Sequence, residues 1–403
     1  MTTPASAFAA SQVRRSFQQR LVTWYRRHAR PLPWRENRDP YRVWISEIML
    51  QQTQVATVEP YFHRFVTELP HLAALAAADE SQVLRLWEGL GYYRRARQLH
   101  RAAQVIVAKH AGRFPSDSEA VRSLPGIGRY TAGAILSIAF DASEPILEAN
   151  TVRLFSRIIG FDGDPTKAVG ANLLWQTATD LLPASGAGEF NQALMELGSR
   201  ICTPREPACG ECPLASYCVA RQQGRQAEIP RAKAKPRIEA VREAAVVVRR
   251  RGRVLVIQRR EGERWAGLWD FPRFALDEPQ TRTTTAAVST TQAPDNCLAV
   301  RLKNELCRKV AAQTGVTIKP IAKLATLVHS VTRFRITLDC YTAEFVDAGG
   351  DRPDLPPHRW LRPAELEAIP LCVTGRKLAR LITAEEAATV RPVRNSTRTA
   401  RKK

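Results

Sequence analysis

The chain has 403 residues, which is enough for two or three domains with sizeable cores. Lys and Arg total 60 against 39 acidic residues, and the formal net charge of +21 favours a polyanionic partner, with nucleic acid ahead of a membrane surface. No apolar run approaches the roughly 20 residues that span a bilayer, and the N-terminus lacks the order of a signal peptide, so we expect no membrane partner.

Residues 14–220 are typical of a mainly helical domain, which follows a disordered N-terminus over 1–13. Apolar residues recur there at three- and four-residue spacing, as they do on the buried face of an amphipathic helix. Pro and Gly interrupt this pattern between the segments. The predicted helical segments are 17–29, 42–66, 81–90, 94–110, 129–140 and 190–202.

The stretch ILEANTVRL places Glu148 between an apolar run and the start of a further helix. Glu is a poor N-cap, because its longer side chain does not fold back easily onto the first backbone amides. Asn150 or Thr151 would cap better. The pattern therefore predicts another role for the Glu148 carboxylate.

The segment LPGIGRYTAG joins two helical segments through Gly126 and Gly128. Glycines allow a close approach to the backbone, and the amides at the start of the next helix can bind a phosphate. Many helical hairpins contain Gly-x-Gly only to turn the chain, so both explanations stay open at this point.

Four of the eight cysteines lie close together, with the spacing C-x6-C-x2-C-x5-C. In a reduced protein, such a cluster indicates a metal site before it indicates disulfides. Structural zinc usually takes two short-spaced pairs, whereas a [4Fe–4S] cluster tolerates wider spacing, so the spacing favours iron–sulfur and leaves zinc open. The candidate ligands are Cys202, Cys209, Cys212 and Cys218.

After residue 240 the apolar pattern changes to the alternation of β-strands. Residues 244–260 predict two strands joined by a Gly-containing turn, and 334–345 predict another strand. Composition divides this part of the chain into a basic linker over 221–240, an α/β domain over 241–385, a disordered insertion over 275–300 and a basic disordered tail over 386–403.

The hairpin, the ILEANTVRL stretch and the cysteine cluster together resemble the helix-hairpin-helix DNA glycosylase superfamily. Within it, LPWRENRDPYRVWISEIMLQQTQV, WEGLGYYRRARQLH and FNQALMELGSRICTPREPACGECPL are similar to the MutY family of adenine DNA glycosylases. The resemblance covers about 20–220 strongly and 241–380 more weakly. It implies a multidomain protein: a mainly α, two-lobed glycosylase domain with one [4Fe–4S] cluster on the four cysteines, and an α/β Nudix-like C-terminal domain.

Glu47 lies among apolar neighbours on its predicted helix face, and such a carboxyl resists ionisation as a general acid must; taken alone, the pattern also allows a salt-bridged or half-exposed Glu47. The resemblance implies that Glu47 protonates adenine, that Glu148 stabilises the sugar cation and that Asn150 holds Glu148. The family has Asp at that position, and the added methylene of Glu148 lengthens the reach by roughly 1.5 Å. Bifunctional relatives carry a Lys nucleophile where this chain has Tyr130, so we expect a monofunctional enzyme.

The resemblance also implies residues that read the DNA. Gln52 matches a residue inserted near the mispair, with Gln51 as its support, and Tyr92 matches an intercalating aromatic for which Tyr93 could substitute. The matching adenine-pocket residues are Arg30, Leu32 and Trp34.

In the C-terminal domain, Thr332 and Arg333 match the loop that reads 8-oxoguanine, where the family commonly has Phe-Ser-His. Val331 lacks the aromatic wedge of that pattern. Nudix hydrolysis needs clustered glutamates around a metal ion, and at those positions this chain has Lys309, Ala312 and Gln313. We therefore expect no hydrolase activity from this domain.

The resemblance predicts an adenine DNA glycosylase that acts as a monomer on double-stranded DNA with A:8-oxoguanine or A:G mispairs and leaves an abasic site. We expect it in the cytoplasm at the bacterial nucleoid, or in an organelle or the nucleus of a eukaryote. Two alternatives remain: a mismatch glycosylase that removes thymine, and a lesion-binding protein whose catalysis is weak because of Glu148.

Overall fold

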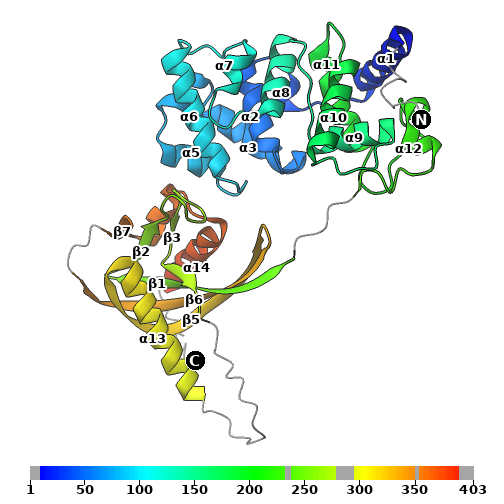
Figure 1. Cartoon of the computed structure of the whole chain (residues 1–403). Coiled ribbons are helices and arrows are strands. Elements are labelled where there is room, and N and C mark those ends of the chain that lie inside the picture. The colour runs from blue at the N-terminus through cyan, green and yellow to red at the C-terminus, as the bar shows by residue number, and fades with distance from the viewer. Residues whose placement is uncertain (1–9, 232–236, 278–294, 350–353, 390–403) are drawn as a thin grey trace, which may run out of the picture. The chain divides into compact units, whose positions relative to one another are not determined.

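The computed structural model describes residues 10–231, 237–277, 295–349 and 354–389. The chain forms two compact units, which divide between residues 235 and 236 (Figure 1). The first unit is helical and the second contains a mixed β-sheet, which confirms the predicted fold class. Within these four ranges, no helix is both long and apolar enough to cross a membrane.

Helices account for the regular structure of the first unit. In chain order they are α1 (Ser11–His28), η2 (Pro33–Arg35), α2 (Pro40–Leu50), α3 (Val55–Glu68), α4 (Leu72–Ala77), α5 (Glu80–Trp87), α6 (Arg94–Lys109), α7 (Ser118–Arg122), α8 (Arg129–Phe140), α9 (Ala149–Ile159), α10 (Ala168–Leu181), α11 (Ala187–Arg200), η3 (Ala215–Tyr217) and α12 (Val219–Gln222).

Two helical lobes make up this unit. The lobe formed by α2–α8 buries large aromatic side chains, among them Phe65 and Trp87, whose rings meet edge to face. The other lobe combines α1 with α9–α12, and its core joins Phe17 of α1 to Phe155 of α9 and Phe190 of α11. The N-terminal helix α1 therefore packs beside α11, which lies near the C-terminal end of the unit in sequence (Figure 1).

The segment 42–66 contains a break that the apolar spacing does not predict. Helix α2 ends and α3 begins within it, so the prediction of one continuous helix is wrong at residues 51–54. Gln52 adopts a left-handed backbone conformation, with φ 57°, which interrupts the helical hydrogen bonds. Periodicity missed the break because the polar run between the two apolar stretches carries no phase signal.

A tight turn joins α7 to α8. Gly126 has φ 77°, and a Cβ there would lie 2.6 Å from the Gln98 side-chain oxygen, so this position requires glycine. Gly128 is the N-cap of α8, and a Cβ added there would meet no atom within 4 Å. Helix α8 has the bounds that its apolar spacing predicts.

The second unit is a seven-stranded sheet with helices. Its path is β3-β2-β1-β6-β5, with β4 paired to β1 and β7 paired to β2. Strand β1 runs parallel to β6, and β5 forms a long antiparallel hairpin with β6. The elements are β1 (Glu239–Arg250), β2 (Arg253–Gln258), β3 (Trp269–Asp270), β4 (Arg273–Ala275), α13 (Asp295–Thr314), β5 (Val316–Val331), β6 (Phe334–Ala348), β7 (His358–Leu361), η4 (Pro363–Ala368) and α14 (Val373–Thr389).

Both faces of this sheet are covered, because successive side chains of a strand point to opposite faces. Val247 of β1 packs in a core with Leu378 of α14. Its neighbour Val246 packs in a second core with Leu306 and Val310 of α13. Figure 1 shows these two helices on the sheet.

Several predicted boundaries differ from the structure: α12 continues to Gln222 and β1 begins at Glu239, both inside the expected linker, and three longer helices also extend past their expected limits. Helix α1 includes residues 11–13, α13 begins at Asp295 inside the expected insertion, and α14 continues to Thr389 past the expected start of the tail. Each of these three differences extends a helix into a stretch with little apolar signal. The predicted disorder over 1–9, 278–294 and 390–403, and the linker residues 232–236, lie outside the described residues.

Candidate active site

A cavity of about 880 Å³ lies in the first unit, lined by α2, the turn after it, the α7–α8 hairpin, the start of α9 and α11. It brings together eleven predicted site residues from four separate sequence segments. They are Arg30, Leu32, Trp34, Glu47, Gln51, Gln52, Gly126, Gly128, Tyr130, Glu148 and Asn150.

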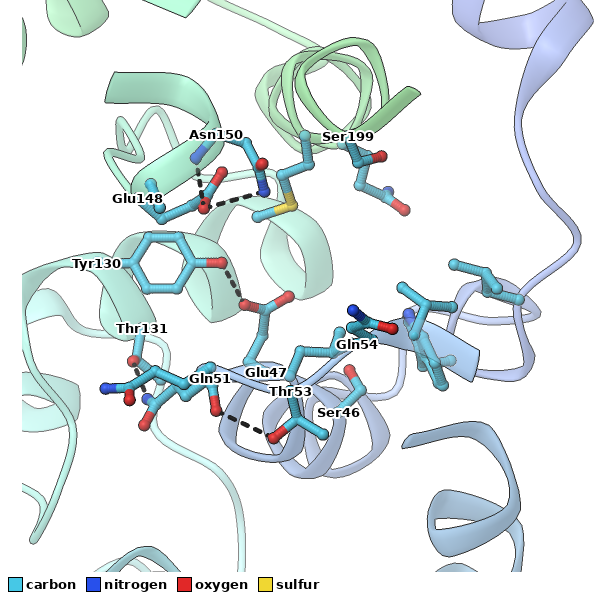
Figure 2. Close-up of a pocket in the computed structure, with 18 of the residues that line it drawn as sticks. Ser46, Glu47, Gln51, Thr53, Gln54, Tyr130, Thr131, Glu148, Asn150 and Ser199 are labelled. Carbon is cyan, nitrogen blue, oxygen red and sulfur yellow. Dashed lines mark hydrogen bonds between the residues drawn. The ribbon is translucent and has the colours of Figure 1, made fainter. Parts of the chain in front are cut away.

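Glu47 projects from α2 into this cavity (Figure 2) and is only 5% exposed. Burial raises its pKa from 4.5 to about 7, since desolvation disfavours the charged carboxylate. The hydrogen bond from Tyr130 opposes this shift, while the nearby charge of Glu148 adds to it. Glu47 can therefore hold and release a proton near neutral pH.

Tyr130 is the second residue of α8, and its hydroxyl donates a hydrogen bond of 2.6 Å to Oε2 of Glu47. Burial and the two neighbouring carboxylates raise the pKa of Tyr130 well above its usual value, so its hydroxyl keeps its proton. In Figure 2 the ring lies between the side chains of Glu47 and Glu148. This contact fixes the orientation of the Glu47 carboxyl group.

Glu148 is the N-cap of α9, so the prediction that it does not cap the helix is wrong. Its side chain folds back and accepts hydrogen bonds from the backbone amides of Asn150, at 2.8 Å, and Thr151, at 3.1 Å. The cap forms because the hydroxyl of Thr151 accepts in return from the Glu148 amide, which completes a capping box. Burial raises the pKa of Glu148, and the hydrogen bonds from Asn150 and Thr151 oppose that rise.

Asn150 connects the carboxylate to the cysteine loop. Its side-chain amide donates to Oε2 of Glu148 at 3.2 Å, and its Oδ1 accepts from Nη2 of Arg153 at 3.0 Å. Nε of Arg153 in turn donates to the carbonyl of Cys202 at 2.7 Å. One line of hydrogen bonds therefore runs from the cavity to the cysteines.

Sequence reasoning missed an ion cluster around a buried carboxylate beside the cavity. Glu196 of α11 is fully buried and accepts from Nε of Arg30 at 2.7 Å and Nη2 of Arg35 at 2.8 Å. Burial opposes ionisation of Glu196, but its hydrogen bonds and charge pairing with the two arginines outweigh burial and lower its pKa. The available signal was an acidic residue on the apolar face of the segment 190–202.

The two predicted wedges both take left-handed backbone conformations, which are uncommon away from glycine. Gln52 has φ 57° and Tyr92 has φ 48°. Tyr92 lies outside the cavity residues and is 50% exposed, whereas Tyr93 is buried. The exposed ring is therefore Tyr92, the first of the two candidates.

The four clustered cysteines line one small cavity after α11, where Nη1 of Arg157 donates to Cys202 Sγ at 3.3 Å. Burial raises the pKa of Cys212 to about 12, so a positively charged centre is needed to hold its thiolate. In the described part of the chain, no three His, Cys, Asp or Glu side chains are arranged to hold a single metal ion. Four thiolates that line one cavity are the ligand set of an iron–sulfur cage.

In the second unit, Thr332 and Arg333 form the tip of the β5–β6 hairpin, and both are exposed. Arg333 lies over the ring of Phe334 and pairs with Glu239 at 3.3 Å. On α13, the ammonium of Lys309 lies 2.6 Å from Asp277 and pairs with a second carboxylate on its own helix. The ammonium of Lys309, at one of the positions where Nudix hydrolysis needs a glutamate, therefore pairs with two carboxylates.

Family models match three parts of the chain. Residues 45–178 match the HhH-GPD superfamily base excision DNA repair proteins, 202–218 match the iron–sulfur binding domain of endonuclease III, and 244–381 match the NUDIX domain. A thermostable thymine-DNA glycosylase structure is 30% identical, with a TM-score of 0.48, over 52% of this chain and 97% of that one.

The curated relatives described below are all adenine DNA glycosylases. The adenine DNA glycosylase of Rattus norvegicus is 32% identical over 91% of this chain and 78% of its own length. That of Buchnera aphidicola (from Schizaphis graminum) is 38% identical over 64% of this chain and 75% of its own, and that of Homo sapiens 42% over 53% and 41%. The chain therefore belongs to the adenine DNA glycosylase family, as a DNA N-glycosylase of base excision repair that carries one [4Fe–4S] cluster.

Proposed function

We propose that this protein hydrolyses the N-glycosidic bond of adenine paired with 8-oxoguanine or guanine in double-stranded DNA and leaves an abasic site. One observation carries the proposal: a carboxyl with a pKa of about 7 shares a cavity with a second carboxylate that hydrogen bonds hold in place. This is the arrangement of an acid and a cation stabiliser in glycoside hydrolysis.

Glu47 is the proposed general acid. Near pH 7 a large share of its carboxyl groups are protonated, so it can give a proton to a ring nitrogen of adenine and make the base a better leaving group. Tyr130 keeps the carboxyl oriented through its 2.6 Å hydrogen bond. A phenol cannot form the Schiff base that a lysine would form there, so the proposed enzyme does not cleave the strand.

Glu148 is the proposed stabiliser of the positive charge that develops on the sugar as the bond breaks. Its capping contacts draw the carboxylate back toward the amides of Asn150 and Thr151. This folding back absorbs part of the extra length, roughly 1.5 Å, that Glu has over Asp. The partial positive charge at the start of α9 also favours the ionised carboxylate.

The remaining cavity residues are proposed to hold the extruded base. Trp34 is buried and meets Phe62 edge to face, so it forms a rigid apolar wall. Arg30 is held by Glu196 and presents a fixed cation beside that wall. We propose that Thr332 and Arg333 contact the opposite base, with Arg333 supplying hydrogen-bond donors.

The test is single-turnover adenine release from duplexes with A:8-oxoguanine, A:G and A:T pairs, with a T:G duplex for thymine release. The natural protein is expected to release adenine from the first two, and Glu148→Gln to lose this activity. The Glu148→Asp rate measures how well the backbone suits the longer side chain. If the natural protein binds the duplex tightly without releasing adenine, and Glu148→Asp restores release, the protein has a lesion-binding role instead of the proposed one. If it releases thymine from the T:G duplex, its substrate is thymine and not adenine.

A further inference from the structure

Arg95 of α6 lies between the two elements that carry the proposed wedges. Its Nη1 donates hydrogen bonds to the backbone carbonyls of Ile48, at 2.7 Å, Met49, at 3.3 Å, and Gln51. These carbonyls belong to the end of α2 and the turn that carries Gln52. The last carbonyls of a helix lack partners within the helix, so one guanidinium closes this end and fixes where the turn begins.

The same guanidinium also contacts the second wedge. Its carbon lies 5.1 Å from the ring centroid of Tyr92 and 5.6 Å from that of Trp87, at the end of α5. Trp87 is fully buried, so it anchors this stack to the core of the lobe. Arg95 thus joins the exposed ring of Tyr92 to the end of the helix that bears Glu47.

Burial of the Arg95 guanidinium costs more free energy than a role in packing alone would explain. Burial lowers the pKa of Arg95 to about 10, and among the described residues no carboxylate pairs with it. Its Nε and Nη2 are buried without a hydrogen-bond partner. Gln52 and Tyr92 on either side both hold left-handed backbone conformations, which persist only where the surroundings fix them.

We propose that Arg95 is a positioning residue that holds the Gln52 turn and the Tyr92 ring in a fixed relation, so that the two wedges enter the duplex together and extrude the target base. The inference rests on the proposed function. This fixed relation controls the step in which the target base is unstacked, and that step precedes breakage of the N-glycosidic bond. Arg95 itself contacts carbonyls and rings of the protein, so its role does not require a phosphate contact.

Arg95→Met tests this, because it removes the donors and keeps an unbranched stem beside the rings. Arg101→Met is the control, since it removes one exposed cation from the same helix. Two substrates are compared. One is a duplex with an A:8-oxoguanine pair. The other is the same duplex with adenine opposite a base-free spacer, where the adenine can be extruded without breaking a base pair. A 2-aminopurine beside the adenine reports extrusion by fluorescence, and adenine release is followed in a single turnover.

Arg95→Met is expected to slow both the fluorescence rise and adenine release from the paired duplex by about 10- to 100-fold, the range for loss of a charged hydrogen-bond donor. On the spacer duplex the change is expected to stay within about threefold, and Arg101→Met is expected to match the natural protein on both. Equal slowing on the two substrates, or no slowing on either, overturns the proposal. Arg95→Lys, measured in parallel, keeps the comparison possible if the Met variant fails to fold.

Salt dependence separates this role from a phosphate contact. The slope of log affinity against log salt is expected to be the same for Arg95→Met and the natural protein, and a drop of about one in its magnitude would overturn the inference. A natural protein that extrudes the base but releases no adenine would refute the proposed function, while the fluorescence comparison would still decide the role of Arg95.

Discussion

Glu47→Gln is expected to stabilise the folded protein at alkaline pH while it abolishes adenine release. The pKa of Glu47 is about 7 in the folded state against 4.5 ordinarily. Below pH 4.5 the carboxyl is protonated in both states, and between 4.5 and 7 the unfolded chain releases its proton first, so folding stability falls as pH rises. Above pH 7 the loss is complete and amounts to about 3 kcal/mol. Gln cannot ionise and avoids it.

The assay is urea unfolding of the natural and variant proteins at pH 5 and pH 8.5, with the cluster kept intact. The stability advantage of Glu47→Gln is expected to grow by about 2 to 3 kcal/mol between these conditions. The Gln oxygen can still accept the hydrogen bond from Tyr130, so that contact is matched. Glu119→Gln, at an exposed position of α7, controls for the loss of one charge. An advantage that does not change with pH would refute the assignment of Glu47 as a buried, proton-holding acid.

Three further predictions follow from the same contacts. Tyr130→Phe removes the hydrogen bond that lowers the pKa of Glu47, so the alkaline limb of the single-turnover pH profile should move up by about 1 to 2 pH units; a downward move would contradict this. Glu196→Gln removes the buried carboxylate that pairs with the partly buried guanidiniums of Arg30 and Arg35 and should cost about 2 to 4 kcal/mol in urea unfolding, whereas a cost below about 1 kcal/mol would mean that water replaces the pairing. Cys212→Ser removes a proposed cluster ligand and should lower the iron content per chain and the unfolding temperature; unchanged iron content would exclude Cys212 as a ligand.

The sequence alone determined the features that depend on local spacing. The apolar repeat of α8 predicted its two ends, because residues on the buried face of a helix recur every three or four positions. The cysteine spacing predicted a metal centre and favoured iron–sulfur over zinc, because four ligands within seventeen positions, 202–218, can surround one centre without help from the rest of the fold. The apolar surroundings of Glu47 predicted a carboxyl that resists ionisation, since its buried neighbours lie on its own helix.

Tertiary structure decided which residues from distant parts of the sequence contact each of these elements. Glu196 meets Arg30 across 166 positions of sequence, so no local pattern could identify that pair. At the break after α2 the backbone carbonyls accept hydrogen bonds from Arg95, which belongs to another helix, and the apolar spacing on either side conceals the break. Glu148 caps its helix because Thr151 closes a reciprocal pair of hydrogen bonds that average capping preferences do not include. Local sequence specifies which face of an element is buried, and only the packed chain determines which charge or donor meets it.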